Sequence, residues 1–161
     1  MLTQRPTLSD IKDARIRTES VVRNTPILTS EYFNDLLGIE LFFKCENFQK
    51  TGSFKLRGAL NKLLSLSDHE KSKGVIAVST GNHGKGVAYA ASLLGVKSTI
   101  YMSSMVPEYR KLAIEALGAN VEIVGQNSDE ADLYARNISE KENITLIHLS
   151  LIHISEPTRP Y

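Results

Sequence analysis

The chain has 161 residues, 42% of them apolar and 23% charged, a composition typical of one globular domain or slightly more. Nineteen basic residues against 18 acidic ones give a net charge of +1, which offers no broad basic surface to nucleic acid. The longest weakly polar stretch, residues 87–96, is about half of the ~20 residues that a membrane span needs, and no signal peptide is indicated. A lone cysteine, Cys45, provides neither a disulfide nor metal-ligand spacing, so we expect a cytoplasmic protein without a metal site.

The first part of the chain predicts three helices and a strand. Apolar residues recur at helical spacing over 7–22, and a second helix is predicted over 30–37, with Ser30 as its cap and Gly38 as its left-handed stop. Alternating apolar residues over 39–45 indicate a strand, and another helix is predicted from Ser53 to about Leu66. Residues 67–73 lack any apolar side chain, which predicts a solvated connector between two domains.

Beyond this connector, short apolar strands alternate with amphipathic helices. Strands are predicted over 75–78, 98–102, 121–124 and 144–147, and helices over 84–94, 107–117 and 128–141. This order predicts an α/β fold, in which a parallel sheet is covered by helices on both faces. Ligands of such sheets bind at the carboxyl ends of the strands, so the loop after Val78 is a candidate site.

Residues 149–161 break this pattern, with two prolines among the last five residues and no periodicity. They resemble the translation of a sequencing adapter, and we expect a non-native tail that carries no fold information. His148 is then expected to be the last genuine residue, and the chain an N-terminal fragment.

Two loops carry candidate chemistry. Residues 50–59 read Lys-Thr-Gly-Ser-Phe-Lys-Leu-Arg-Gly-Ala, and residues 79–86 read Ser-Thr-Gly-Asn-His-Gly-Lys-Gly. The second loop opens a helix after a buried strand, which favours binding of a carboxylate or phosphate. Its spacing fits neither a Walker A loop nor a dinucleotide-binding motif. The alternative is that its glycines serve tight helix–strand packing and that His83 caps the helix.

Lys55 taken alone is most simply an exposed lysine, because most lysines are solvated. Its neighbours suggest more, since the apolar Phe54 and Leu56 and the cationic Arg57 are conditions that favour a neutral, nucleophilic amine.

Taken together, the motifs at 53–59 and 79–84 resemble those of the fold-type II pyridoxal-phosphate enzymes, on the serine/threonine dehydratase and serine racemase branch. The likeness extends over the chain to His148. Leu56 after the lysine and His83 after the asparagine favour the dehydratases over cysteine and threonine synthases. Residues 84–86 and 101–107 are similar to a subgroup associated with hydroxyectoine breakdown.

The resemblance implies pyridoxal 5'-phosphate as cofactor and a small amino acid as substrate. Lys55 would form the Schiff base with the cofactor and would remove the α-proton of the substrate. Phe54 would pack beside the cofactor ring, and Asn82 would hydrogen-bond the ring's 3-oxygen. The substrate carboxylate would bind the second loop, through Ser79, Thr80, Asn82 and His83.

The implied reaction is the elimination of the β-hydroxyl group of serine or threonine, giving a 2-keto acid and ammonia. Thr80 occupies the position where racemases carry a proton-donating serine, so racemase activity is one alternative, and a hydroxyectoine-derived substrate is another. An alternative from another class is a Rossmann-like module that binds an anion without chemistry.

The resemblance also implies a domain organisation. Residues 1–66 would open the large cofactor-binding domain, and residues 74–148 would form a small Rossmann-like domain. The family's glycine-rich phosphate loop lies in the later half of its sequences. We therefore expect the chain itself to be inactive and the intact parent to be a homodimer or larger.

Overall fold

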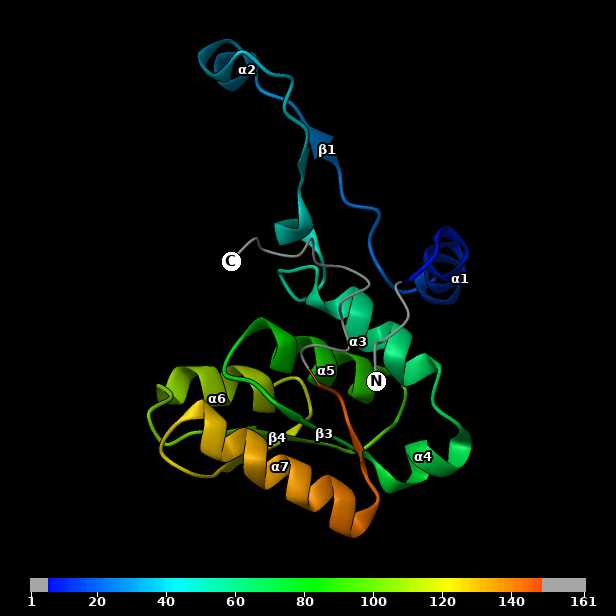
Figure 1. Cartoon of the computed structure of the whole chain (residues 1–161), viewed down its shortest axis with the longest axis vertical. Coiled ribbons are helices and arrows are strands. Elements are labelled where there is room, and N and C mark those ends of the chain that lie inside the picture. The colour runs from blue at the N-terminus through cyan, green and yellow to red at the C-terminus, as the bar shows by residue number, and fades with distance from the viewer. Residues whose placement is uncertain (1–5, 149–161) are drawn as a thin grey trace.

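The computed structural model describes residues 6–148, which are built around a four-stranded parallel sheet (Figure 1). The strands are β3 (Val75–Val78), β4 (Ser98–Met102), β5 (Asn120–Ile123) and β6 (Thr145–Leu146), in the spatial order β5-β4-β3-β6. All three strand pairs are parallel, and Val75 of β3 is in register with both Ser98 and Thr145. The predicted parallel α/β sheet is confirmed.

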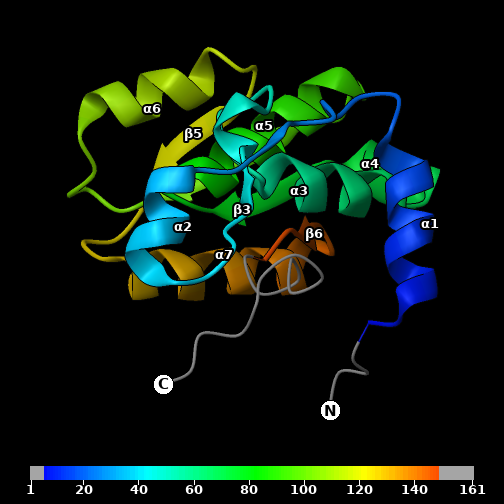
Figure 2. The ribbon, with the colours of Figure 1, turned by 90° about the horizontal axis from the view of Figure 1, so that it is seen from above.

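Helices cover both faces of this sheet (Figure 2). On one face, α5 (Asn82–Leu93) and α6 (Glu108–Glu115) bury the side chains of Ala77, Ile100 and Val121. On the other face, α7 (Ser128–Glu142) packs through Ala135 against Ile76 and Tyr101. Because both faces are covered, β3 is apolar at every position and β4 is apolar after its first two residues, Ser98 and Thr99, which explains why both strands can be predicted from the sequence.

A further helix, α3 (Lys55–Leu64), packs on the outer side of α5. Its residues Leu56, Leu60 and Leu63 are fully buried and belong to the same apolar cluster as the adjoining face of the sheet. α3 and the α5 face of the sheet therefore share one core. The assignment of residues 1–66 and 74–148 to two domains of a larger enzyme stays a prediction.

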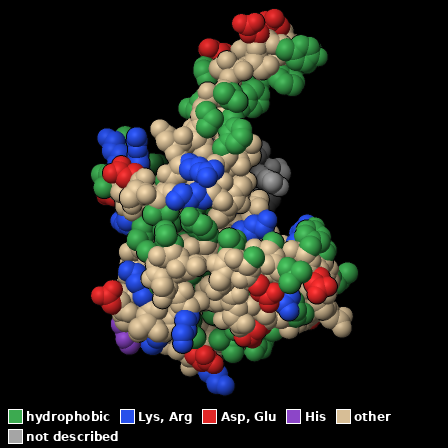
Figure 3. Space-filling model, turned by 180° about the vertical axis from the view of Figure 1, so that it is seen from behind, with side chains coloured by type: hydrophobic (Ala, Val, Ile, Leu, Met, Phe, Trp, Pro, Cys, Tyr) green, Lys and Arg blue, Asp and Glu red, His purple; other side chains and the backbone are tan. Residues whose placement is uncertain are grey.

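Helix α1 (Leu8–Thr18) lies beside α3, and the chain between these two helices extends away from the sheet as a narrow arm (Figures 1 and 3). The arm contains β1 (Ile27–Leu28), α2 (Glu31–Leu37) and β2 (Phe43–Lys44), and the 3-10 helix η1 (Glu46–Phe48) leads from it back to α3. β1 and β2 form a two-stranded antiparallel sheet. The arm exposes many large apolar side chains, among them Ile27, Leu28, Phe33, Leu36, Leu37, Ile39, Phe42 and Phe43.

Three sequence-based predictions of secondary structure are wrong in detail. The first helix ends at Thr18 instead of continuing to residue 22, because the Thr18 hydroxyl donates to the Ala14 carbonyl and a turn follows. The strand expected over 39–45 is limited to the two residues that pair with β1.

The predicted connector at 67–73 is instead a short helix, α4 (Asp68–Lys73). Ser67 and Glu70 form a capping box at its start, and its acidic first turn and basic last turn match the helix dipole. Such a short helix can form without an apolar face, because neighbouring side chains pair with the free backbone N–H groups at its start and with the charge of its dipole at both ends.

Between residues 6 and 148, no helix combines the length and the apolar character that crossing a bilayer requires. The predicted non-native tail, residues 149–161, lies outside the described residues.

Candidate active site

The loop after β3 connects the carboxyl edge of the sheet to α5. The backbone N–H of Ser79 donates to the Tyr101 carbonyl at 3.2 Å, and the Ser79 Oγ accepts from the Gly81 N–H at 3.2 Å. Gly81 is the N-cap of α5, and no side chain of the described residues caps this helix. The first amides of α5 lack intrahelical partners, so this end of the helix favours an anion.

Lys55 is the first residue of α3 and is half-buried. A turn at Gly52, whose φ is +74°, reverses the chain just before it, and the Arg57 N–H donates to the Phe54 carbonyl at 2.9 Å to start the helix. The Phe54 ring lies beside the amine, with 4.6 Å between its centroid and Lys55 Nζ. The local sequence thus places an amine and an aromatic ring together at the start of a helix.

Two glycines of α5 allow neighbouring helices to pack closely. A Cβ at Gly86 would lie 3.1 Å from the carbonyl carbon of Lys55 and 3.2 Å from the nitrogen of Leu56, so this glycine brings the backbone at the start of α3 against α5. A Cβ at Gly84 would lie 2.7 Å from Ile114 Cδ1 of α6. Both glycines thus serve packing, but chiefly between helices instead of between helix and strand as predicted.

His83 is buried, with 3% of its surface exposed, and its Nε2 lies 2.8 Å from the Ile147 carbonyl oxygen. Because a carbonyl oxygen only accepts, Nε2 carries the proton and Nδ1 carries the lone pair. Burial lowers the pKa of His83 below its ordinary value of 6.5; the bond to Ile147 opposes this, and the charges of Lys55 and His148 lower it further. The imidazole is neutral at pH 7 and bonded to the chain just after β6, so the prediction that His83 caps α5 is wrong.

Thr80 and Asn82 occupy the edge of the same loop. The Thr80 carbonyl accepts a hydrogen bond of 3.4 Å from Arg110 Nη1 of α6, and Asn82 is the first residue of α5 and is exposed. Arg110 was not identified from the sequence. Its only signal was its place in the helix after β4, which starts at the same edge of the sheet.

Arg57 does not direct its charge toward Lys55. Its Nε and Nη2 donate to the two carboxylate oxygens of Glu46 at 2.8 and 2.7 Å. The charge of Arg57 is therefore balanced by a neighbouring carboxylate, and the residue joins α3 to η1.

The polar groups around Lys55 fit a bound cofactor. Within residues 6–148, three buried side-chain polar atoms have no hydrogen-bond partner, and all lie on the two loops: Thr51 Oγ1, Ser53 Oγ and His83 Nδ1. Unsatisfied buried groups are rare in folded proteins and are typical of sites that bind a ligand. An amine, an aromatic ring and an open helix end are the groups that an aldehyde carrying an anionic substituent needs.

The fold and this arrangement define an α/β protein with a lysine-centred site at the carboxyl edge of a parallel sheet. Comparisons with known proteins identify the family more closely. The profile of the pyridoxal-phosphate dependent enzymes matches residues 18–154. An L-threonine ammonia-lyase of Geobacter sulfurreducens is 43% identical over 138 residues, which are 86% of this chain and 34% of that protein.

Solved structures agree with this assignment. The serine racemase of Dictyostelium discoideum has a TM-score of 0.81 and 42% identity, covering 88% of this chain and 46% of that one. The processed form of threonine deaminase isoform 2 from Solanum lycopersicum has a TM-score of 0.78 and 34% identity, covering 88% and 43%.

The chain belongs to the family of pyridoxal-phosphate-dependent enzymes, and the predicted fold type II is confirmed. The names of these relatives agree with the predicted dehydratase and serine racemase branch. The cofactor of this family is pyridoxal phosphate. The likeness to the hydroxyectoine subgroup stays a prediction. The chain spans 34–42% of the length of the first curated relatives that it matches.

Proposed function

We propose that Lys55 binds pyridoxal phosphate covalently and that the protein deaminates β-hydroxy amino acids of the serine/threonine type. The observation that carries this proposal is the close contact at Gly86, where the backbone of Lys55 and Leu56 lies against α5 one turn after the open start of that helix. The electrostatic effect of Lys55 on His83 supports the same proximity. Relatives named L-threonine ammonia-lyase and threonine deaminase support the reaction.

Each loop residue then has a role. Phe54 would pack beside the cofactor ring, Asn82 would hydrogen-bond the ring oxygen, and Ser79 and the first amides of α5 would hold the substrate carboxylate. The cofactor, when bound, supplies a ring that withdraws electrons from the Cα of the substrate. With the substrate amine in its place on the cofactor, Lys55 Nζ would remove the proton from that Cα and return it to the β-hydroxyl group, which would leave as water. Hydrolysis of the released product would then give the 2-keto acid and ammonia.

His83 would act on the substrate through its backbone. With Nε2 bonded to Ile147, the side chain is committed to the chain after β6, so His83 would contribute its backbone N–H to the carboxylate. The neutral state of the imidazole keeps a second positive charge away from Lys55.

We further propose that residues 1–66 complete a large domain together with chain that lies beyond residue 148 in a longer protein. The exposed apolar side chains of the arm support this, as does the coverage of 34–42% of the first curated relatives. A cavity of about 640 Å³ between α1 and α3, lined by Ile11, Val22 and Asn61, would be filled by the same chain. We also propose that this longer protein is cytoplasmic and forms a homodimer or a larger assembly.

Borohydride reduction in the presence of pyridoxal phosphate tests the site. Mass spectrometry of the reduced chain should find Lys55 labelled faster than Lys141, an exposed lysine on α7. In Lys55→Arg the label at that position should vanish while the background at Lys141 persists. Equal labelling of Lys55 and Lys141, together with phosphate binding, would instead support the non-catalytic anion-binding module.

Racemisation is a second candidate function, favoured by the Thr80 hydroxyl and by the likeness to serine racemase. Chiral analysis of L-serine incubated with the longer protein measures it. Formation of D-serine that disappears in Thr80→Val, with deamination retained, would support a proton donor at Thr80. If the unaltered protein forms no more D-serine than Thr80→Val does, this activity is excluded.

A further inference from the structure

Glu46, which lies outside the two loops, is the centre of a polar network behind Lys55. Its Oε1 accepts from Arg57 Nη2 at 2.7 Å and from the Thr25 hydroxyl at 2.5 Å, and its Oε2 accepts from Arg57 Nε at 2.8 Å. Lys44 Nζ donates to the Thr25 carbonyl at 2.6 Å. Thr25 is buried, and the side chains of Glu46 and Arg57 are 15% and 32% exposed, so the ion pair is shielded from water mainly on the side of the carboxylate.

The same network joins three segments that are distant in the sequence. Arg57 Nη2 also donates to the Arg23 carbonyl at 3.0 Å. The buried Gln49 side chain accepts from the Arg23 N–H at 2.9 Å and donates to the Arg23 carbonyl at 3.1 Å. The segment around Arg23, the chain at 46–49 and the first turn of α3 are thus held together by side chains.

Arg57 is two residues after Lys55, in the first turn of α3. The other side of this turn packs against α5. The Leu56 side chain of α3 is fully buried, and Gly86 of α5 allows the two helix backbones to come close. The backbone that carries the Lys55 amine is therefore fixed from two directions, by apolar packing on α5 and by the carboxylate of Glu46. Reactive groups need such support, because a displacement of about 1 Å can slow a reaction by ~100-fold.

We propose that Glu46 is a positioning residue for Lys55, which acts through Arg57 to hold the amine where it captures the cofactor aldehyde. This inference rests on the proposed function of Lys55. Glu46→Gln keeps the shape of the side chain but removes its charge and turns an amide N–H₂ toward Arg57. The bidentate contact is lost, and the first turn of α3 is held from one side only.

The test measures covalent capture of pyridoxal phosphate by the whole 161-residue chain, trapped with borohydride, as a function of cofactor concentration. In Glu46→Gln the limiting rate at Lys55 should fall about 10- to 100-fold, with little change in the concentration that gives half this rate. Glu46→Asp, which restores the charge, should recover part of the rate. Glu40→Gln, which removes an exposed carboxylate from the same arm, should have no effect.

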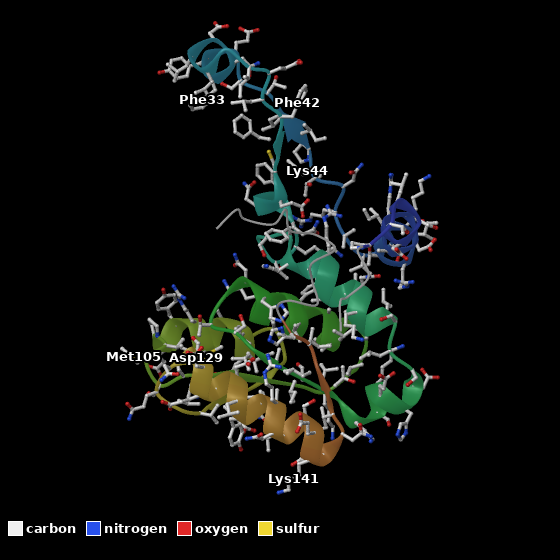
Figure 4. The ribbon with its side chains drawn as sticks, in the orientation of Figure 1. Phe33, Phe42, Lys44, Met105, Asp129 and Lys141 are labelled. Carbon is white, nitrogen blue, oxygen red and sulfur yellow. The ribbon has the colours of Figure 1, made fainter. Side chains whose placement is uncertain are left out.

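Lys141 serves as an internal control, because it lies at the far end of α7 from Lys44 and the arm (Figure 4). Its labelling should be the same in all variants. A limiting rate at Lys55 in Glu46→Gln equal to that of the unaltered chain overturns the inference. If the unaltered chain itself labels Lys55 no faster than Lys141, the proposed function fails and the inference fails with it.

Arg57→Lys covers the case in which Glu46→Gln does not fold, since it keeps the positive charge but cannot form the two hydrogen bonds that Arg57 donates to Glu46. Its limiting rate at Lys55 should fall severalfold, and an unchanged rate with an unchanged circular dichroism spectrum overturns the inference.

Discussion

Replacement of Gly84 by alanine should destabilise the protein, and shortening Ile114 to valine should relieve much of the effect. The added Cβ would lie 2.7 Å from Ile114 Cδ1 and 3.3 Å from the Ser79 carbonyl oxygen, whereas carbon atoms pack at about 3.5–4 Å. Ile114 is fully buried, so its Cδ1 has little room to move. Overpacking of this kind costs about 1–3 kcal/mol, and the better helix propensity of alanine offsets about 0.5–1 kcal/mol of it.

Ile114→Val removes the Cδ1 atom and should cost about 0.5–1.5 kcal/mol by itself. In the double variant the new methyl group occupies the space of the lost one, so the two effects should not add. We expect a favourable coupling of about 1 kcal/mol or more, measured by urea unfolding of all four proteins followed by circular dichroism. Additivity within about 0.5 kcal/mol would refute the contact between α5 and α6 on which this reasoning depends.

Three further predictions concern the stability of the core and of the site. Stability should fall as the pH drops below 6.5, because unfolded His83 takes up a proton that the buried imidazole, with its lowered pKa, does not. The loss is at most about 1.4 kcal/mol per pH unit, and urea midpoints at about pH 7.5 and 5.5 should differ less in His83→Gln than in the unaltered chain. Leu60→Ala should cost about 2–5 kcal/mol in the same unfolding assay if α3 shares the core of the sheet, and a loss below about 1 kcal/mol would contradict this. Thr51→Val removes a buried hydroxyl that has no hydrogen-bond partner within residues 6–148 and should be neutral or stabilising by up to about 1 kcal/mol in thermal unfolding. A clear loss of stability in Thr51→Val would show that the hydroxyl is satisfied in solution.

The sheet and its helices could be predicted because each signal in residues 75–148 is local. Strand β3 is apolar at every position because both of its faces are covered, and α5 ends before Gly95, whose φ of +66° stops a helix. The loop after Val78 could be selected as the site for the same reason, since the carboxyl edge of a parallel sheet follows from the strand order alone.

The contacts that tune the site could not be predicted, because they join residues far apart in the sequence. His83 and Ile147 are 64 residues apart, and no local pattern indicates that a carbonyl of the second fixes the tautomer of the first. Arg57 could be read as a charge near Lys55, but its partner is set by how η1 folds back onto α3. At residues 67–73 the spacing of Ser67 and Glu70 is that of a capping box, and this local signal for a helix outweighs the lack of apolar residues.

The distribution of unsatisfied polar atoms links the stability of the fold to its chemistry. Each buried polar group without a partner costs about 1–3 kcal/mol, so a sequence selected for stability alone would replace it with an apolar residue. Within residues 6–148 the three such atoms belong to Thr51 and Ser53, just before Lys55 in the sequence, and to His83, on the loop after β3. The remaining core, with Leu56, Leu60 and Ile100 fully buried, supplies the stability that tolerates this loss. Because such violations of local rules are expected at functional sites, the three atoms support the proposal that these two loops bind a ligand.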